Sequence, residues 1–136
     1  MQYKLVDRRP VPCADSKEWW EWFRTTDRHV ADTRLDDIRV STAFLGLEHN
    51  PLPDGRPALF ETEMNVNGEA NPLRRYAVWE DAEAGHAEIV RMIKAEIASA
   101  GGSSGESARK VGERVVQRIQ TVEMGSEQVT KQFKPD

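Results

Sequence analysis

The chain has little cysteine: Cys13 is the only one among its 136 residues. An intramolecular disulfide cannot form, and a zinc cluster built on cysteines is excluded, which is typical of a reducing compartment. The longest apolar run extends from Ala43 to Leu47 and contains a glycine, so it is far too short to cross a bilayer. The N-terminal residues also lack the apolar core of a signal peptide. We therefore expect a cytoplasmic protein without a membrane partner.

The chain also lacks a strong charge of one sign, because its net charge is −4. Its basic residues occur as separate pairs rather than as a stripe along one element, for example Arg8 with Arg9 and Arg74 with Arg75. A dedicated nucleic-acid-binding protein concentrates such residues on one face. Nucleic acid is therefore not an expected partner.

Motifs for nucleophilic catalysis and phosphate binding are missing as well. No glycine-rich phosphate loop precedes a helix, and Ser41 and Thr42 lie within an expected strand rather than on a sharp turn. Cys13 lies in a proline-rich leader. The sequence thus favours a protein that is not an enzyme, with no cofactor.

A first helix is expected to begin near Ser16, because Asp15 and Glu18 have the spacing of a capping box. Its apolar face is rich in aromatic residues, which is typical of core packing in a small domain. This face comprises Trp19, Trp20, Trp22, Phe23 and Val30.

The fold class predicted from periodicity is α+β, with a small antiparallel sheet of about three strands packed against helices. The expected strands are 38–48, 58–66 and 74–79, because apolar and polar residues alternate there or both faces become apolar. Residues 80–98 have the apolar spacing of a helix that packs on the sheet. Together these elements predict a core domain over residues 1–100.

Residues 101–105 have the composition of a flexible linker, and residues 106–136 are expected to form an appended C-terminal amphipathic helix. Its stripe could dock on its own domain, exchange with a second copy of the chain, or bind another protein. We favour association, as a partner-binding helix or a homo-oligomer contact. The residues expected to carry it are Val111, Val115, Ile119 and Val122.

A group of His49, Glu61 and His86 is a candidate metal site. His49 leaves the first predicted strand, Glu61 lies on the second, and His86 lies within the apolar stripe of the 80–98 helix. Two imidazoles and a carboxylate with an open position can hold a divalent metal such as zinc or manganese and activate water. The alternative is that buried histidines donate hydrogen bonds to the backbone and exposed glutamates are solvated.

The segments VSTAFLGLEHN, PALFETEM and RRYAVWEDAEAGH together resemble a family of small uncharacterised proteins encoded by bacteriophages and prophages. The family pattern reads V-S-T-x-F-L-G-L-D-H, then L-F-E-T-M-V, then R-Y-x-T-W-E-E-A-x-x-G-H, and the resemblance covers roughly residues 38–90. This chain departs from it at Glu48, Glu63 and Val78, where the family has aspartate, an apolar residue and a threonine. The resemblance implies a phage origin and a bacterial host cytoplasm.

The main functional hypothesis is therefore a phage-derived accessory protein that binds and modulates a host or phage protein, as an inhibitor of a host enzyme or of a defence system. One alternative is a small metal-dependent hydrolase or metal-binding regulator that uses His49, Glu61 and His86. Another is a minor component of the virion.

Overall fold

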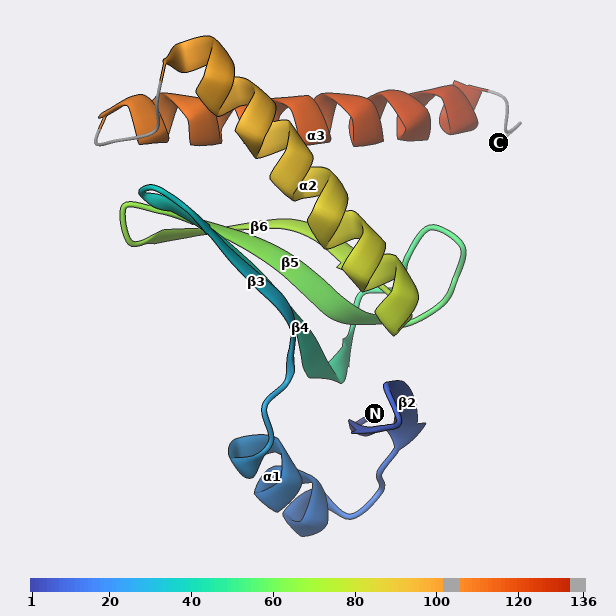
Figure 1. Ribbon diagram of the computed structural model, residues 1–136. Coiled ribbons are helices and arrows are strands. Elements are labelled where there is room, and N and C mark those ends of the chain that lie inside the picture. The colour runs from blue at the N-terminus through green and yellow to red at the C-terminus, as the bar shows by residue number, and fades with distance from the viewer. Residues whose placement is uncertain (102–105, 133–136) are drawn as a thin grey trace.

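The computed structural model describes residues 1–101 and 106–132, and it describes side chains as far as Thr121. A hairpin and a short helix come first, four strands follow, and the two longer helices come last (Figure 1). In chain order the elements are β1 (Tyr3–Val6), β2 (Arg9–Pro12), α1 (Ser16–Thr25), β3 (His29–Leu35), β4 (Ile38–His49), β5 (Ala58–Val66), β6 (Glu69–Tyr76), α2 (Trp79–Ala100) and α3 (Glu106–Gln132).

The central sheet is antiparallel with the strand order β3-β4-β5-β6, and β1 and β2 form a separate hairpin. The α+β class is confirmed, but the prediction of three strands was wrong because the sheet has four. The missed strand is β3. Val30 fits a helical period with the aromatic residues, yet α1 ends at Thr25 and the Asp27 carboxylate accepts a hydrogen bond from the backbone N–H of His29 at 3.0 Å. This local turn stops the helix and starts the strand.

The last strand, β6, covers residues 69–76 rather than the predicted 74–79. Asn71 and Pro72 have the composition of a turn, but they lie within the strand opposite Met64 and Glu63. Proline is tolerated there because β6 is an edge strand, where a missing N–H costs no ladder hydrogen bond. β5 has the predicted bounds, and α2 contains the whole predicted 80–98 helix.

Both α2 and α3 pack on the same face of the sheet (Figure 1). The main core is formed where the strands meet these helices, and its sheet side includes Ile38, Val40, Met64 and Val66. The α3 stripe completes it, since Val111 and Val115 are fully buried and Ile119 is nearly so. The chain's own core thus covers these three side chains, which is the arrangement expected for intramolecular docking of the helix. The side chain of Val122 lies outside the described residues.

A charged contact fixes α3 on α2. Glu96 is a buried carboxylate on α2, and its side chain pairs with the guanidinium of Arg118 at 2.8 Å and with that of Arg114 at 4.0 Å. A buried carboxylate without these partners would be costly, so the two arginines set the rotation of α3 about its axis.

The opposite face of the sheet is polar, because alternate residues of each strand point away from α2. Ion pairs cross between neighbouring strands there. Arg75 pairs with Glu61 at 2.9 Å, and Arg39 forms a two-point contact with Asp32. The sheet therefore has one face in the core and one charged face.

Candidate functional site

The N-terminal module consists of residues 1–25, which include β1, β2 and α1, and of the end of β4, residues 46–49. Figure 1 shows it at one end of the sheet, on the side away from α3. The N-terminal end of the β1-β2 hairpin is bonded to β4. Gln2 forms an antiparallel bridge with Leu47, and the backbone N–H of Glu48 donates to the carbonyl of Met1 at 3.1 Å. The Trp19 indole N–H donates to the carbonyl of Tyr3 at 2.9 Å and joins the helix to the hairpin. Three segments distant in sequence are thus locked together.

Gly46 allows the close packing of α1 on β4. It has a φ of 78°, in the left-handed region, and a Cβ at this position would lie 3.0 Å from the Phe23 ring and 3.2 Å from the Trp19 ring. A larger residue would be strained both by its backbone and by these two rings. The glycine of the FLGL segment is therefore required by the contact between strand and helix.

Glu48 anchors the N-terminal module. Its carboxylate accepts a hydrogen bond from the Tyr3 hydroxyl at 2.7 Å and lies 3.8 Å from the N-terminal ammonium group. The hydrogen bond to Glu48, aided by partial burial, raises the pKa of Tyr3 above its ordinary value. His49 follows as an exposed residue at the end of β4. The carboxylate at this strand end therefore holds the hairpin in place.

The N-terminal module carries all the large apolar side chains that are exposed in the described part of the chain. Trp20 on α1 is 55% exposed, although its neighbour Trp19 is buried. The full set is Met1, Val6, Val11, Trp20 and Leu47. Exposed single apolar residues are ordinary, but their confinement to one module, with a tryptophan among them, is typical of an interaction surface.

Trp20 belongs to a stack of flat side chains. Its ring stacks on Phe23 with a centroid distance of 6.2 Å and an interplanar angle of 18°, and the guanidinium of Arg28 lies 3.7 Å from the Phe23 centroid. Arg28 also donates to the carbonyl of Phe44 at 2.8 Å, and its partial burial lowers its pKa. These contacts hold Phe23, and through it they support an exposed tryptophan face.

Sequence patterns identified only part of this surface. The helical spacing indicates that Trp20 widens the stripe of α1, but it does not show that the indole is exposed. Val6 and Val11 lie on the face of the hairpin opposite to Tyr3 and Leu5, which pack against the core. The turn between them has positive φ at both Asp7 and Arg8. It contains no glycine or asparagine, the residues that usually indicate such a turn in a sequence. The hairpin was therefore missed, together with its exposed valines.

His86 lies at the centre of a buried polar chain. Its Nδ1 is 2.8 Å from the Thr42 hydroxyl and its Nε2 is 2.8 Å from the Thr33 hydroxyl. The chain continues from Thr42 to Thr62 at 2.6 Å and from Thr62 to the Tyr76 hydroxyl at 2.9 Å. Each strand of the sheet thus contributes one hydroxyl. Burial lowers the pKa of His86, against a smaller opposing effect of Asp32, so the neutral ring is favoured.

The three proposed metal ligands are not brought together. His86 is on the sheet-facing side of α2 and is bonded to two threonines, whereas Glu61 is on the opposite face of the sheet and pairs with Arg75. His49 is at the exposed end of β4. Across the described residues, no group of three or more histidine, cysteine, aspartate or glutamate side chains has the spacing of a metal site.

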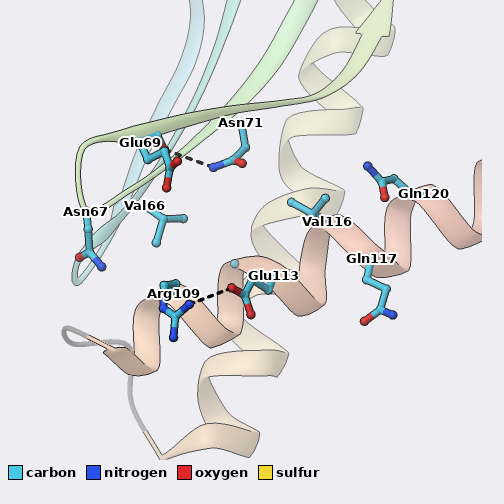
Figure 2. Close-up of a pocket in the computed structure, with 10 residues that line it drawn as sticks. Val66, Asn67, Glu69, Asn71, Arg109, Glu113, Val116, Gln117 and Gln120 are labelled. Carbon is cyan, nitrogen blue, oxygen red and sulfur yellow. Dashed lines mark hydrogen bonds and ion pairs between the residues drawn. The ribbon is translucent and has the colours of Figure 1, made fainter.

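A groove of about 530 Å³ lies between α3 and the β5-β6 turn (Figure 2). Several of its polar groups are already bonded to one another: Arg109 pairs with Glu113 at 3.3 Å, and the Asn71 side-chain amide donates to the carbonyl of Glu69 at 3.2 Å. All four residues are at least partly exposed. The groove therefore offers no buried, unpaired group to fix a ligand.

Comparisons with protein-family models, with curated proteins and with solved structures gave no match for this chain. None of the helices in the described residues is both long and apolar enough to span a membrane.

Proposed function

We propose that this chain is a non-catalytic accessory protein that binds another protein through its N-terminal module. The observation that carries the proposal is the confinement of the exposed large apolar side chains to this module, with Trp20 at 55% exposure. Tryptophan is enriched among the residues that dominate binding energy at protein interfaces. The module is also anchored at both the hairpin and the helix, so its surface is presented without a large ordering cost.

The resemblance of residues 38–90 to phage and prophage proteins supports a more specific proposal. In it the partner is a host or phage protein, and binding inhibits a host enzyme or a defence complex. The N-terminal module lies outside the resembling segment except for the end of β4. A variable binding surface on a shared sheet is a common way for one scaffold to serve different partners.

The test compares capture of bacterial proteins by the wild-type chain, by Trp20→Ser and by a control, Lys110→Ser. Lys110 is exposed on α3, away from the N-terminal module. If Trp20 is a central contact, its loss weakens binding by about 2 kcal/mol or more, or roughly 30-fold in Kd. We expect a stoichiometric partner with the wild type and with Lys110→Ser, and a strongly reduced yield with Trp20→Ser.

Circular dichroism of the same three proteins separates loss of binding from loss of folding, since Trp20 is exposed and its replacement leaves the core intact. Equal capture by Trp20→Ser and by a second variant, Leu47→Ser, would show that the module is not the binding surface. Repeated absence of any stoichiometric partner would count against the function itself.

A further inference from the structure

The two edges of the sheet differ in how well they are protected against pairing with another strand. β6 contains Pro72, and its register with β5 shifts between Thr62 and Glu63. Proline and irregular register both discourage further strand addition. β3 has seven residues without proline or glycine, and its only register shift lies at the His29 end. The β3 edge is therefore the one open to another strand.

The hydrogen bonds of the sheet show which backbone groups of β3 point outward. The N–H of Asn67 donates to the carbonyl of Asp37 at 3.4 Å, so in this alternating ladder Arg39 is bonded to β5 and its neighbours Ile38 and Val40 are bonded to β3. Their partners on β3 are Leu35 and Thr33. The backbone groups of Asp32 and Arg34 alternate with these and therefore point away from the sheet.

The side chains of these two residues are complementary to a second copy of the same strand. When two copies of β3 pair antiparallel about Thr33, Asp32 of each copy lies opposite Arg34 of the other. Shifting the register to the next bonded positions places either Asp32 against Asp32 or Arg34 against Arg34, which is unfavourable. One register is thus selected by charge and by the direction of the backbone groups together.

The core-side residues of β3 are also compatible with this pairing of two copies. Ala31 and Leu35 lie on the α2 side of β3, and both are half-buried in the single chain. In the register centred on Thr33, Ala31 lies opposite Leu35 of the second copy, so apolar side chains meet on the core side. Arg34 forms no ion pair with the described residues of its own chain. Asp32 is already held by Arg39, but each carboxylate oxygen can accept a second hydrogen bond, so Arg34 of the other copy can add to this pair.

We propose that the chain forms a twofold-symmetric homodimer through the β3 edge, with Thr33 at the axis, so that two four-stranded sheets become one continuous sheet. The twofold symmetry makes each favourable contact occur twice. This surface is separate from the N-terminal module and from α3. The homodimer uses residues of neither one, so the proposal does not depend on the proposed function.

The experiment uses two charge variants of the full chain, Asp32→Lys and Arg34→Glu. Each places like charges opposite one another at both symmetry-related positions, and we expect each to raise the Kd of the homodimer roughly tenfold or more. An equimolar mixture of the two variants restores the attraction, because the introduced lysine faces the introduced glutamate and the remaining Arg34 faces the remaining Asp32. Sedimentation should show dimer in the wild type and in the mixture, and less in either variant alone.

Arg91→Glu is the matched control, because Arg91 is exposed on α2 and the change in net charge is the same as for Arg34→Glu. It should dimerise like the wild type. A wild-type chain that remains monomeric up to about 1 mM would overturn the proposal. A dimer unaffected by both edge variants, or a mixture that shows no recovery over its components, would also overturn it.

Discussion

At the scale of single residues, the buried ring of His86 makes stability dependent on pH. Its folded-state pKa is lowered by burial, whereas an unfolded histidine has a pKa of about 6.5. Between these values the unfolded chain binds more protons, so the free energy of unfolding rises with pH. The contribution is fully present above about pH 6.5 and is lost as the pH falls through the window, with a slope of at most about 1.4 kcal/mol per pH unit.

Urea unfolding at about pH 7.5 and about pH 5 measures this effect. We expect the wild type and the control His49→Gln to lose stability on acidification, and His86→Gln to show a smaller loss between the same two conditions. The carboxylates of Asp27, Asp32 and Asp54 have lowered pKa values and titrate below this window. An equal slope in all three proteins would assign the pH dependence to other groups.

At the scale of elements, Gly112 sets how closely α3 approaches the sheet. A Cβ at this position would lie 2.8 Å from Cγ2 of Val66 on β5. Alanine in place of glycine ordinarily stabilises an exposed helix by about 1 kcal/mol, but overpacking a core costs about 1–3 kcal/mol. We expect Gly112→Ala to lower the free energy of unfolding, as measured by chemical denaturation.

The same contact gives a direct control. Val66→Ala removes the methyl groups that the new Cβ would meet, so Gly112→Ala should cost less in that background than in the wild type. The difference is the coupling energy of a double-mutant cycle. Additive effects of the two substitutions would show that Val66 does not limit the approach of α3.

Elements with clear periodicity were predictable from the sequence, and those at the sheet edges were not. Alternating apolar residues gave β5 its bounds, and the spacing of Ala82, His86, Ile89 and Ile93 gave α2. Both edge strands were misjudged, because a strand that packs with one neighbour only carries a weak pattern. Val30 also fitted a helix, and Pro72 resembled a turn.

The candidate sites show the same limit. His86 was expected to face the sheet, and it does, but its two partners come from β3 and β4, whose register the sequence does not reveal. Glu61 and His86 looked compatible as ligands because the sequence does not show which face of β5 is covered by α2. In the structure α2 covers the face opposite to Glu61. Exposure of Trp20 depends on how α1 docks on Gly46, which is also a tertiary property.

At the scale of the whole molecule, α3 is part of the main core. Removing residues 101–136 would expose the apolar side chains of β5 and α2 that contact Val111, Val115 and Ile119. Large apolar truncations in a core cost about 2–5 kcal/mol each, and the total stability of a domain is about 5–15 kcal/mol. We therefore expect the truncated chain to melt far lower or to aggregate, as measured by thermal unfolding and light scattering.

A pair of point variants separates burial from helix formation. Val115→Asp places a carboxylate in the core, whereas Gln117→Asp places it on an exposed position of the same helix. Strong destabilisation should follow only the first. If the truncation folds with an unchanged melting temperature, α3 is not part of the folding unit.

The chain of hydroxyls beneath α2 has a consequence for how the protein reaches its fold. If a strand pairs one residue out of register, all its side chains switch to the other face of the sheet. Its threonine or tyrosine would then point to the charged face. A slipped β3 or β4 would leave a ring nitrogen of His86 without its threonine, and a slipped β5 or β6 would leave a buried hydroxyl further along the chain without its partner. Because each of the four strands supplies one hydroxyl, every group of the chain has its partner only when all the strands are in register. The buried polar chain thus stabilises the native strand register relative to a slipped one.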